Sequence, residues 1–359
     1  MRIFVTGALG FIGAHFVERA LADGHEIRGL YRGPQPGQTE LLRKFTALGA
    51  QLTPGDVLEP ETYAAWLKDV DCICHFAAAF KGSSHTDEDF HRINVTGTER
   101  VLAAGAAASV KRFVFCSTAG IYGQRLAGVT TEAAPAQPWN GYERSKHAAE
   151  ELLRKHATQF AIEYVILRPS VVYGPRDDRL LKLFRSAAKG RFPLFGAGEG
   201  RRHMVYVTDV ADAFLLGCKS PDAANQEMII AGPDAVPLHA MLNVLAEVVQ
   251  RASCGPRLPL APMLVLAAIV EDGCKLLRIN PPLYRRRMDF YRSDAAFDCA
   301  RAQRVLGWSP RIDLREGFAR TYEHSRQPAT LSAQIASYAL AAITLICDSA
   351  LMGTGWVAV

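Results

Sequence analysis

The sequence predicts an α/β fold, built on a doubly wound parallel sheet with a smaller C-terminal lobe. Short apolar or β-branched runs alternate with stretches of helical spacing, and Gly, Asp or Ser bounds most of the runs. The expected strands are residues 3–5, 26–31, 72–76, 112–116 and 164–167. Repeated alternation of strand and helix favours a parallel sheet that helices cover on both faces.

The composition of the chain changes after residue 170. Helical spacing is clear over residues 14–22 and 148–156, whereas glycine and proline become frequent in residues 191–200 and 254–262. We expect a first domain over residues 1–170, with a return segment near residues 201–232. Residues 171–326 then form mainly the smaller lobe, and residues 327–359 are an apolar C-terminal extension.

Composition excludes several classes of protein. The 359 residues are 49% hydrophobic and 21% charged, which is ordinary for a globular chain and excludes disordered and collagen-like classes. The net charge of +5 is mild, and its densest basic run is Arg285-Arg286-Arg287. A solvated helix face explains that run most simply, with a patch for an anionic substrate as the alternative. We expect no nucleic-acid partner, because no broad basic stripe accompanies it.

The cysteines indicate neither a disulfide framework nor a metal site. Of the eight, only Cys72 and Cys74 are close in sequence, and their spacing fits neither a zinc site nor a redox Cys-x-x-Cys. We therefore expect buried free thiols in a reducing compartment and no bound metal. Three glycines interrupt the apolar N-terminal stretch, so we expect it to belong to the fold of a cytoplasmic protein rather than to a signal peptide.

A glycine-rich turn follows the first strand directly and opens an apolar helix. Its glycines are Gly7, Gly10 and Gly13, each separated by two residues. Glycines allow a tight turn and let the backbone approach a pyrophosphate, which then lies at the positive helix N-terminus. The turn therefore predicts a dinucleotide site in a Rossmann-type domain.

This spacing resembles the extended short-chain dehydrogenase/reductase superfamily, in particular its NAD-dependent epimerase/dehydratase family and its 3β-hydroxysteroid dehydrogenase branch. Four further segments resemble the superfamily: Gly55-Asp56-Val57, His75-Phe76-Ala77-Ala78, Asn94-Val95-Thr96-Gly97-Thr98 and Leu306-Gly307-Trp308-Ser309-Pro310. The resemblance covers about residues 1–322 and implies an NAD(P)-dependent enzyme, a substrate-binding C-terminal lobe and a homodimer.

The resemblance also implies which residues bind the cofactor. They are Gly7, Leu9, Gly10, Phe11, Ile12, Gly13, Arg32, Asp56, Val57, Phe76, Ala77, Ala78, Asn94, Tyr142, Lys146, Arg168, Pro169, Ser170 and Val171. NAD sites usually carry an acid at the end of the second strand, whereas an Arg accommodates the 2′-phosphate of NADP. Here that strand ends in Leu30-Tyr31-Arg32, so NADP is favoured over NAD.

Tyr142 and Lys146 are the candidate catalytic pair. Four residues apart on a helix, they share one face, so the positive charge of Lys146 favours the phenolate form of Tyr142. The resemblance adds a third residue: Thr118 would hydrogen-bond the reacting oxygen and Ser117 would support it, although their order could be reversed. Together they would transfer a proton while the nicotinamide carries the hydride.

The residues after Thr118 exclude one branch of the superfamily. Its sugar-nucleotide 4,6-dehydratases follow that Thr with an Asp-Glu pair, because elimination of water needs a further acid and base. This chain has Ala119 and Gly120 instead. Dehydratase chemistry is therefore not expected.

Two substrate classes compete. Arg202 precedes Val207-Thr208-Asp209 as in superfamily members that bind the diphosphate of a nucleotide-sugar, with Arg201 beside it. However, Val171 lies where those members carry an Asn, and the segment around it looks like the 3β-hydroxysteroid dehydrogenase and flavonol-reductase branches, which act on apolar secondary alcohols or ketones. The apolar residues 259–270 and 281–284 are candidates for lining an apolar pocket. We favour a nucleotide-sugar, with Arg202, Thr118 and Tyr142 as substrate-binding residues.

Two further alternatives concern the whole protein and its C-terminal tail. A non-catalytic NADP sensor would have no need of Tyr142 and Lys146, so we expect an enzyme. The apolar residues 335–347 number fewer than the ~20 that span a bilayer. Residues 331–359 contain no Lys or Arg for a membrane-surface helix. Membrane association is not favoured, and catalysis should not require the tail.

Overall fold

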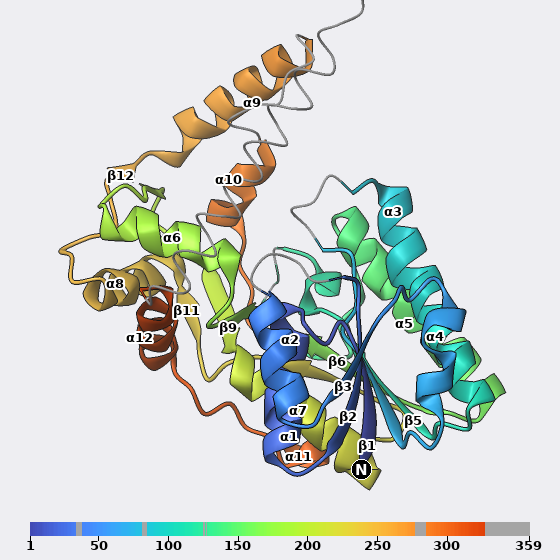
Figure 1. The fold of residues 1–359 in the computed structure, drawn as a ribbon. Coiled ribbons are helices and arrows are strands. Elements are labelled where there is room, and N and C mark those ends of the chain that lie inside the picture. Colours follow the sequence, from blue (N-terminus) through green and yellow to red (C-terminus); the bar gives the residue numbers. More distant parts are fainter. Residues whose placement is uncertain (34–37, 81–84, 125, 127, 277–284, 327–359) are drawn as a thin grey trace, which may run out of the picture.

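The computed structural model describes residues 1–326 except 34–37, 81–84, 125, 127 and 277–284. Its main sheet has seven strands in the order β10-β6-β5-β4-β1-β2-β3, all paired in parallel (Figure 1). The strands are β1 (Arg2–Thr6), β2 (Glu26–Tyr31), β3 (Gln51–Pro54), β4 (Cys72–His75), β5 (Arg112–Cys116), β6 (Glu163–Pro169) and β10 (Gln226–Ile230). The predicted doubly wound α/β fold is confirmed.

Two sets of helices cover the faces of this sheet, as the alternation of strands and helices predicts. One face carries α1 (Phe11–Ala22), α7 (Val207–Lys219) and α11 (Ala300–Leu306), with α2 (Gln38–Ala47) beside α1. The other carries α4 (Gly97–Ala107) and α5 (Gly141–Phe160), preceded by α3 (Asp87–His91) and a π-helical turn at Arg92–Thr96. Short 3₁₀ turns occupy Pro60–Thr62, Ala64–Leu67, Ala119–Tyr122 and Pro221–Ala223.

The register of the central strands brings polar groups to one edge of the sheet. Thr6 is paired with Leu30 on β2 and with His75 on β4, so the carboxyl ends of three strands are level. The Thr6 hydroxyl lies 2.9 Å from Nδ1 of His75, and the opposite ring nitrogen lies 3.1 Å from the hydroxyl of Thr98. Burial lowers the pKa of His75 to about 3, so the ring is neutral and links β1, β4 and α4.

The chain beyond β6 builds a second group of elements beside the sheet (Figure 1). They comprise a three-stranded sheet of β7 (Val171–Tyr173), β9 (Arg201–Tyr206) and β11 (Ala235–Pro237), and a strand pair of β8 (Leu194–Phe195) and β12 (Arg257–Leu258). Their helices are α6 (Asp178–Ala188), α8 (Leu238–Val248), α9 (Leu260–Leu276), α10 (Arg285–Arg292) and α12 (Leu314–Ser325). Tyr173, Phe184 and Phe318 are fully buried among them and give this lobe its own core.

Two segments singled out in the sequence fall outside the described residues. They are residues 281–284, a candidate pocket lining, and the tail from residue 327 onward. Among the helices within the described ranges, none combines the length and the hydropathy needed to cross a bilayer.

Candidate active site

A cleft of about 850 Å³ opens where the carboxyl ends of the strands meet the smaller lobe. It lies between β1 and β4, where the strand order reverses and where open α/β sheets bind their ligands. Its walls come from the glycine turn, the ends of β2, β4 and β5, α5, β7 and β9.

The glycine turn can hold a pyrophosphate because side chains are excluded from it. Gly7 has φ = +69°, and a Cβ added there would lie 2.9 Å from the backbone nitrogen of Ala77. A Cβ on Gly13 would lie 2.2 Å from the carbonyl oxygen of Gly7. Gly10 caps α1 without a side-chain hydrogen bond, and the first turn of α1 has no acid, so the helix N-terminus suits an anion. The turn therefore fits a dinucleotide.

Most residues expected to bind the cofactor do line the cleft. These are Gly7, Leu9, Gly10, Phe11, Ile12, Gly13, Arg32, Asp56, Val57, Phe76, Ala77, Ala78, Tyr142, Lys146, Pro169, Ser170 and Val171. Asn94 and Arg168 are the two that do not, and both are buried. For a dinucleotide, such a cleft supplies a phosphate cradle at one end and, at the other, space beside Tyr142.

Asn94 uses its side chain to join backbone segments. Its Oδ1 accepts from the backbone N–H of Ala79 at 2.7 Å, and its Nδ2 donates to the carbonyl of Ala79 at 3.1 Å. The same Nδ2 donates to the hydroxyl of Ser145 on α5 at 2.8 Å. Asn94 thus fixes the loop after β4 against α5, next to the cleft but outside its lining.

Arg168 belongs to a buried ion-pair cluster centred on Glu150, which the sequence analysis missed. Arg168 donates to both carboxylate oxygens of Glu150, at 2.9 and 2.7 Å, and also to Glu227 and the Tyr122 hydroxyl. Neighbouring carboxylates raise the pKa of Arg168 despite its burial. The cluster joins α5, β6 and β10 behind the catalytic segment, and no sequence motif marks Glu150.

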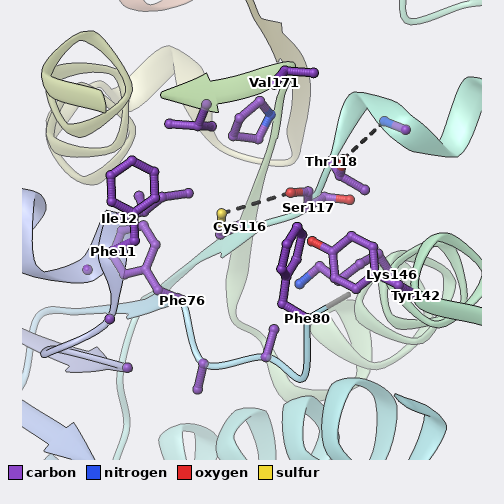
Figure 2. Close-up of a pocket in the computed structure, with 18 of the residues that line it drawn as sticks. Phe11, Ile12, Phe76, Phe80, Cys116, Ser117, Thr118, Tyr142, Lys146 and Val171 are labelled. Carbon is purple, nitrogen blue, oxygen red and sulfur yellow. Dashed lines mark hydrogen bonds between the residues drawn. The ribbon is translucent and has the colours of Figure 1, made fainter. Parts of the chain in front are cut away.

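Tyr142 and Lys146 lie in the first two turns of α5, which Asn140 caps by accepting from the backbone N–H of Glu143. Their hydroxyl and ammonium groups end on the same side of the cleft (Figure 2). Lys146 is only 2% exposed, and its Nζ lies 3.9 Å from the ring centroid of Phe115. Within the described residues this ammonium has no hydrogen bond or ion pair, so its charge is available to a bound group.

Burial sets the proton affinity of Lys146. Loss of solvation lowers the pKa of Lys146 to about 8, and Cys116 and Glu150 raise it by smaller amounts. The amine therefore still carries its proton near neutral pH, where it can stabilise negative charge on Tyr142.

Thr118 and Ser117 follow β5 and both line the cleft, but their hydroxyls differ (Figure 2). Ser117 is buried and donates its proton to Glu150 at 2.5 Å. Thr118 accepts from the backbone N–H of Gly120 at 3.0 Å, which starts the 3₁₀ turn. No acceptor for the Thr118 proton is found in the described part of the chain, so Thr118 can donate to a ligand oxygen.

Two aromatic rings pack against the ring of Tyr142. Its ring meets Phe80 edge to face with 4.9 Å between centroids (Figure 2), and Phe90 at 6.2 Å. Phe80 is 42% exposed and Val171, on β7, is 54% exposed; both line the cleft. Ring and methyl surfaces left open inside a cleft favour an apolar ligand.

Arg202 lies at the opposite wall, on β9, and its guanidinium is largely occupied. Nη1 donates to the carbonyls of Gly200, Arg201 and Ser293, and Nη2 donates to the carbonyl of Phe290. Carbonyls at a helix C-terminus lack intrahelical partners, so Arg202 satisfies the end of α10. The neighbouring Arg201 pairs with Asp294 at 2.8 Å. Both arginines line the cleft, and although Nε of Arg202 has no hydrogen-bond partner among the described residues, both of its Nη groups already donate to main-chain carbonyls.

A group of thiols lies away from the cleft, and the sequence revealed only part of it. Cys72 and Cys74 on β4 meet Cys218 on α7, with all three sulfurs within 4.8 Å of one another. The sulfurs of Cys74 and Cys218 lie 3.2 Å apart, and all three residues are buried free thiols. Cys218 is distant in sequence, so spacing alone could not indicate it.

Comparisons with known proteins agree with this geometry. Residues 3–232 match the family model described as NAD dependent epimerase/dehydratase family. The chain is 30% identical over 341 residues to a UDP-glucose 4-epimerase of Mycolicibacterium smegmatis, covering 91% of this chain and 99% of the relative. It is also 30% identical over 332 residues to a 3 beta-hydroxysteroid dehydrogenase/Delta 5→4-isomerase of Mycobacterium tuberculosis, covering 86% of each.

Among solved structures, the chain is similar to UDP-glucose 4-epimerase of Thermotoga maritima, determined with UDP-glucose. The identity is 25%, the TM-score is 0.73, and the match covers 91% of this chain and 99% of that one.

Proposed function

The chain belongs to the NAD-dependent epimerase/dehydratase family, and on that premise we propose that it reduces a ketone, or oxidises the matching secondary alcohol, on an apolar substrate. It is an enzyme of the extended short-chain dehydrogenase/reductase type. The single observation that carries the apolar substrate is the open ring surface of Phe80, which lies in the cleft and packs edge to face against Tyr142.

In this proposal Tyr142 is the acid/base and Lys146 is its cation. When bound in the cleft, the nicotinamide supplies or accepts the hydride. During ketone reduction, Tyr142 gives its hydroxyl proton to the carbonyl oxygen, and the Lys146 ammonium stabilises the phenolate that remains. Thr118 donates a hydrogen bond to the same oxygen, because its proton is not otherwise used. Ser117 stays bound to Glu150 and fixes the strand end from behind.

The neighbours of Tyr142 and Arg202 move our preference from a nucleotide-sugar to an apolar substrate. The guanidinium of Arg202 donates to four main-chain carbonyls and lies 5.1 Å from the Phe290 ring centroid. Loss of solvation lowers the pKa of Arg202 to about 10, which reflects a position far from bulk water. A diphosphate would have to replace those carbonyl contacts.

A nucleotide-sugar epimerase is the second candidate, and similarity to UDP-glucose 4-epimerases over nearly the whole chain favours it. Such an enzyme would need the same Tyr142 and Lys146, because epimerisation also begins with oxidation of a secondary alcohol. The two candidates therefore differ in substrate and net reaction rather than in proton chemistry.

The proposed cofactor is NADP rather than NAD. Arg32 is exposed at the cleft wall directly after β2, and that strand ends without an acid. The nearby Asp56 accepts from the backbone N–H of Leu58 at 2.9 Å. A 2′-phosphate beside Arg32 would find a cation and no carboxylate at the carboxyl end of β2. A homodimer belongs to the same proposal and rests on family resemblance, and a cytoplasmic location rests on the buried free thiols.

A parallel assay tests the function. The protein is offered NADPH or NADH with uncharged ketones that carry a large apolar group, and separately UDP-glucose and UDP-glucuronate with the oxidised cofactors. We expect cofactor oxidation with the apolar ketones and no epimer from the UDP-sugars. Epimer formation with no reduction of any ketone would establish the second candidate instead.

A further inference from the structure

Three buried thiols meet between the main sheet and α7, the helix that Figure 1 shows packed against that sheet. Cys72 is the first residue of β4, Cys74 is the third, and Cys218 is the next-to-last residue of α7. In the described part of the chain, no other three Cys, His, Asp or Glu side chains bring their ligand atoms this close together. None of the three thiols lines the cleft, so the proposed mechanism does not use them.

The fold, rather than sequence spacing, assembles this group. Side chains alternate along a strand, so Cys72 and Cys74 point to one face of β4 while Ile73 packs in the core on the other face. Helix α7 covers the first face and brings the Cys218 sulfur to 3.2 Å from that of Cys74. The sequence predicts no metal site because only two of these residues are close in the chain.

Ordinary core packing does not require such an arrangement. A free cysteine is commonly buried as a small apolar side chain, and nothing in that role brings sulfurs together. Here all three sulfurs lie within 4.8 Å of one another. Converging sulfurs are soft ligands, which prefer soft metal ions such as Cu(I) to hard ions such as Mg²⁺.

The number of ligands and their burial narrow the choice of ion. Structural zinc sites almost always have four ligands, and a zinc ion with three protein ligands takes a water as the fourth. Cys72 and Cys74 are 0% exposed and Cys218 is 3% exposed, so bulk water does not reach the sulfurs. Cu(I) is stable with three sulfur ligands and needs no fourth, so it suits this site better than Zn²⁺.

Arg112 places a positive charge beside the thiols. It is paired with Cys72 across β4 and β5, and its Nη1 donates to the carbonyls of Cys218 at 3.2 Å and Ser220 at 2.7 Å. Its ion-pair partner Glu163 has a side chain 46% exposed, against 11% for Arg112, so water screens the carboxylate more. The guanidinium therefore offsets part of the negative charge that thiolates would carry.

We propose that Cys72, Cys74 and Cys218 form a Cu(I) site that joins β4 to α7. Binding forms three Cu–S bonds, releases the thiol protons to solvent and changes no oxidation state. The site lies at the amino end of β4, whereas the cleft lies at the carboxyl ends of the strands. Because Cys218 is in the last turn of α7, local opening of that turn admits the ion. This proposal does not depend on the proposed function.

The test measures Cu(I) uptake by the reduced full chain without oxygen. Bicinchoninate supplies the ion and competes for it, and the colour of its Cu(I) complex reports how much the protein has taken. The test variants are Cys74→Ala and Cys218→Ala, and the matched control is Cys254→Ala, at a buried free thiol in the core of the smaller lobe. Cofactor binding shows that each variant is folded, and X-ray absorption counts the sulfur neighbours of the bound ion.

We expect the wild type and Cys254→Ala to take up one Cu(I) with three sulfur neighbours, and the two test variants to bind it at least about a hundredfold more weakly. Cu(I) should also raise the Tm of the wild type and the control, but not that of the test variants. Equal uptake by the test variants, no uptake by the wild type, or a preference for Zn²⁺ overturns the proposal. Fewer than three sulfur neighbours in the wild-type spectrum overturns it whether or not the variants fold.

Discussion

Two buried cations stand at opposite walls of the cleft, and they use their charge differently. Lys146 is 2% exposed and Arg202 is 7% exposed, so each has lost nearly all of its solvation. Arg202 recovers it from four main-chain carbonyls of β9 and the segment around α10. Within the part of the chain that the structure describes, the Lys146 ammonium lies over the Phe115 ring without a hydrogen bond or ion pair, and burial lowers its pKa to about 8.

The two cations differ in role, because Lys146 can act on a bound group whereas Arg202 stabilises the local fold. A buried charge without a full set of partners is costly unless a ligand completes its surroundings, which is the expectation at a catalytic centre. A buried guanidinium whose two Nη groups donate to main-chain carbonyls stabilises the local fold, even though the Nε of Arg202 finds no partner in the described ranges. Burial alone does not distinguish a catalytic cation from a structural one. The number of its N–H donors that are not yet hydrogen-bonded does.

The largest expected effect comes from substituting Tyr142, the residue that the charge of Lys146 assists. Tyr142→Phe keeps the ring that packs on Phe80 and Phe90 and removes only the hydroxyl. Turnover should fall by ~10² to 10⁴, because proton transfer is lost, while cofactor affinity and thermal stability stay near the wild-type values. Steady-state kinetics with a cofactor-binding titration check this, and retained turnover would remove Tyr142 from the mechanism.

The next effect tests the Arg202 side. Arg202→Met removes a donor from four main-chain carbonyls, although those of Gly200 and Arg201 keep a backbone N–H and that of Phe290 keeps the Ser293 hydroxyl, so the free energy of unfolding should fall by about 2 kcal/mol. Arg201→Met is the matched control, since its ion pair with Asp294 is more exposed and should contribute about 1 kcal/mol or less. Urea unfolding measures both. A stable Arg202→Met variant with a raised KM for UDP-sugars would restore the diphosphate role.

A pH profile sharpens the comparison further. Because the pKa of Lys146 is lowered from 10.5 to about 8, mainly by burial, the ammonium is lost as the pH rises through about 8. The kcat for ketone reduction should then fall about tenfold per pH unit. The folded chain releases this proton before the unfolded chain, so this group's contribution to stability rises with pH between about 8 and 10.5. A kcat that stays level up to pH ~10 would show that the cation is dispensable.

The smallest expected effect concerns Arg32, a third cation, which is exposed. Arg32→Ala should raise the KM for NADPH by about tenfold and leave that for NADH nearly unchanged, if the guanidinium meets the 2′-phosphate. Kinetics with both cofactors decide. Equal changes in the KM values for NADPH and NADH would mean that Arg32 does not contact the 2′-phosphate and that the NADP preference has no basis.

Local patterns in the sequence predicted the sheet, the glycine turn and the Tyr142–Lys146 pair, because each depends on neighbours within a few residues. Gly7 and Gly13 line the cleft as their spacing after the first strand indicates, and Lys146 lines it as its spacing from Tyr142 together with the family resemblance indicates. Contacts between distant segments were not predictable. Glu150, Arg168 and Glu227 form one cluster only when α5, β6 and β10 are brought together by the fold. Arg202 contacts α10 only when the smaller lobe has folded.

Asn94 shows the same limit at shorter range. Its motif was recognised, but the partners of its side chain, Ala79 and Ser145, were set by how the loop after β4 packs on α5. Helix α9 is a second example, since the apolar run was visible in the sequence but not which side of it is buried. Periodicity identifies a helix and leaves its environment open.

The most direct measurement follows a labelled hydride. The protein is incubated with an apolar ketone and NADPH that carries deuterium at the transferred position of C4, and the product alcohol is examined by mass spectrometry. The account predicts one deuterium on the carbinol carbon with the wild type, and almost no labelled alcohol with Tyr142→Phe. Alcohol formed without deuterium, or no alcohol formed by the wild type, would contradict it.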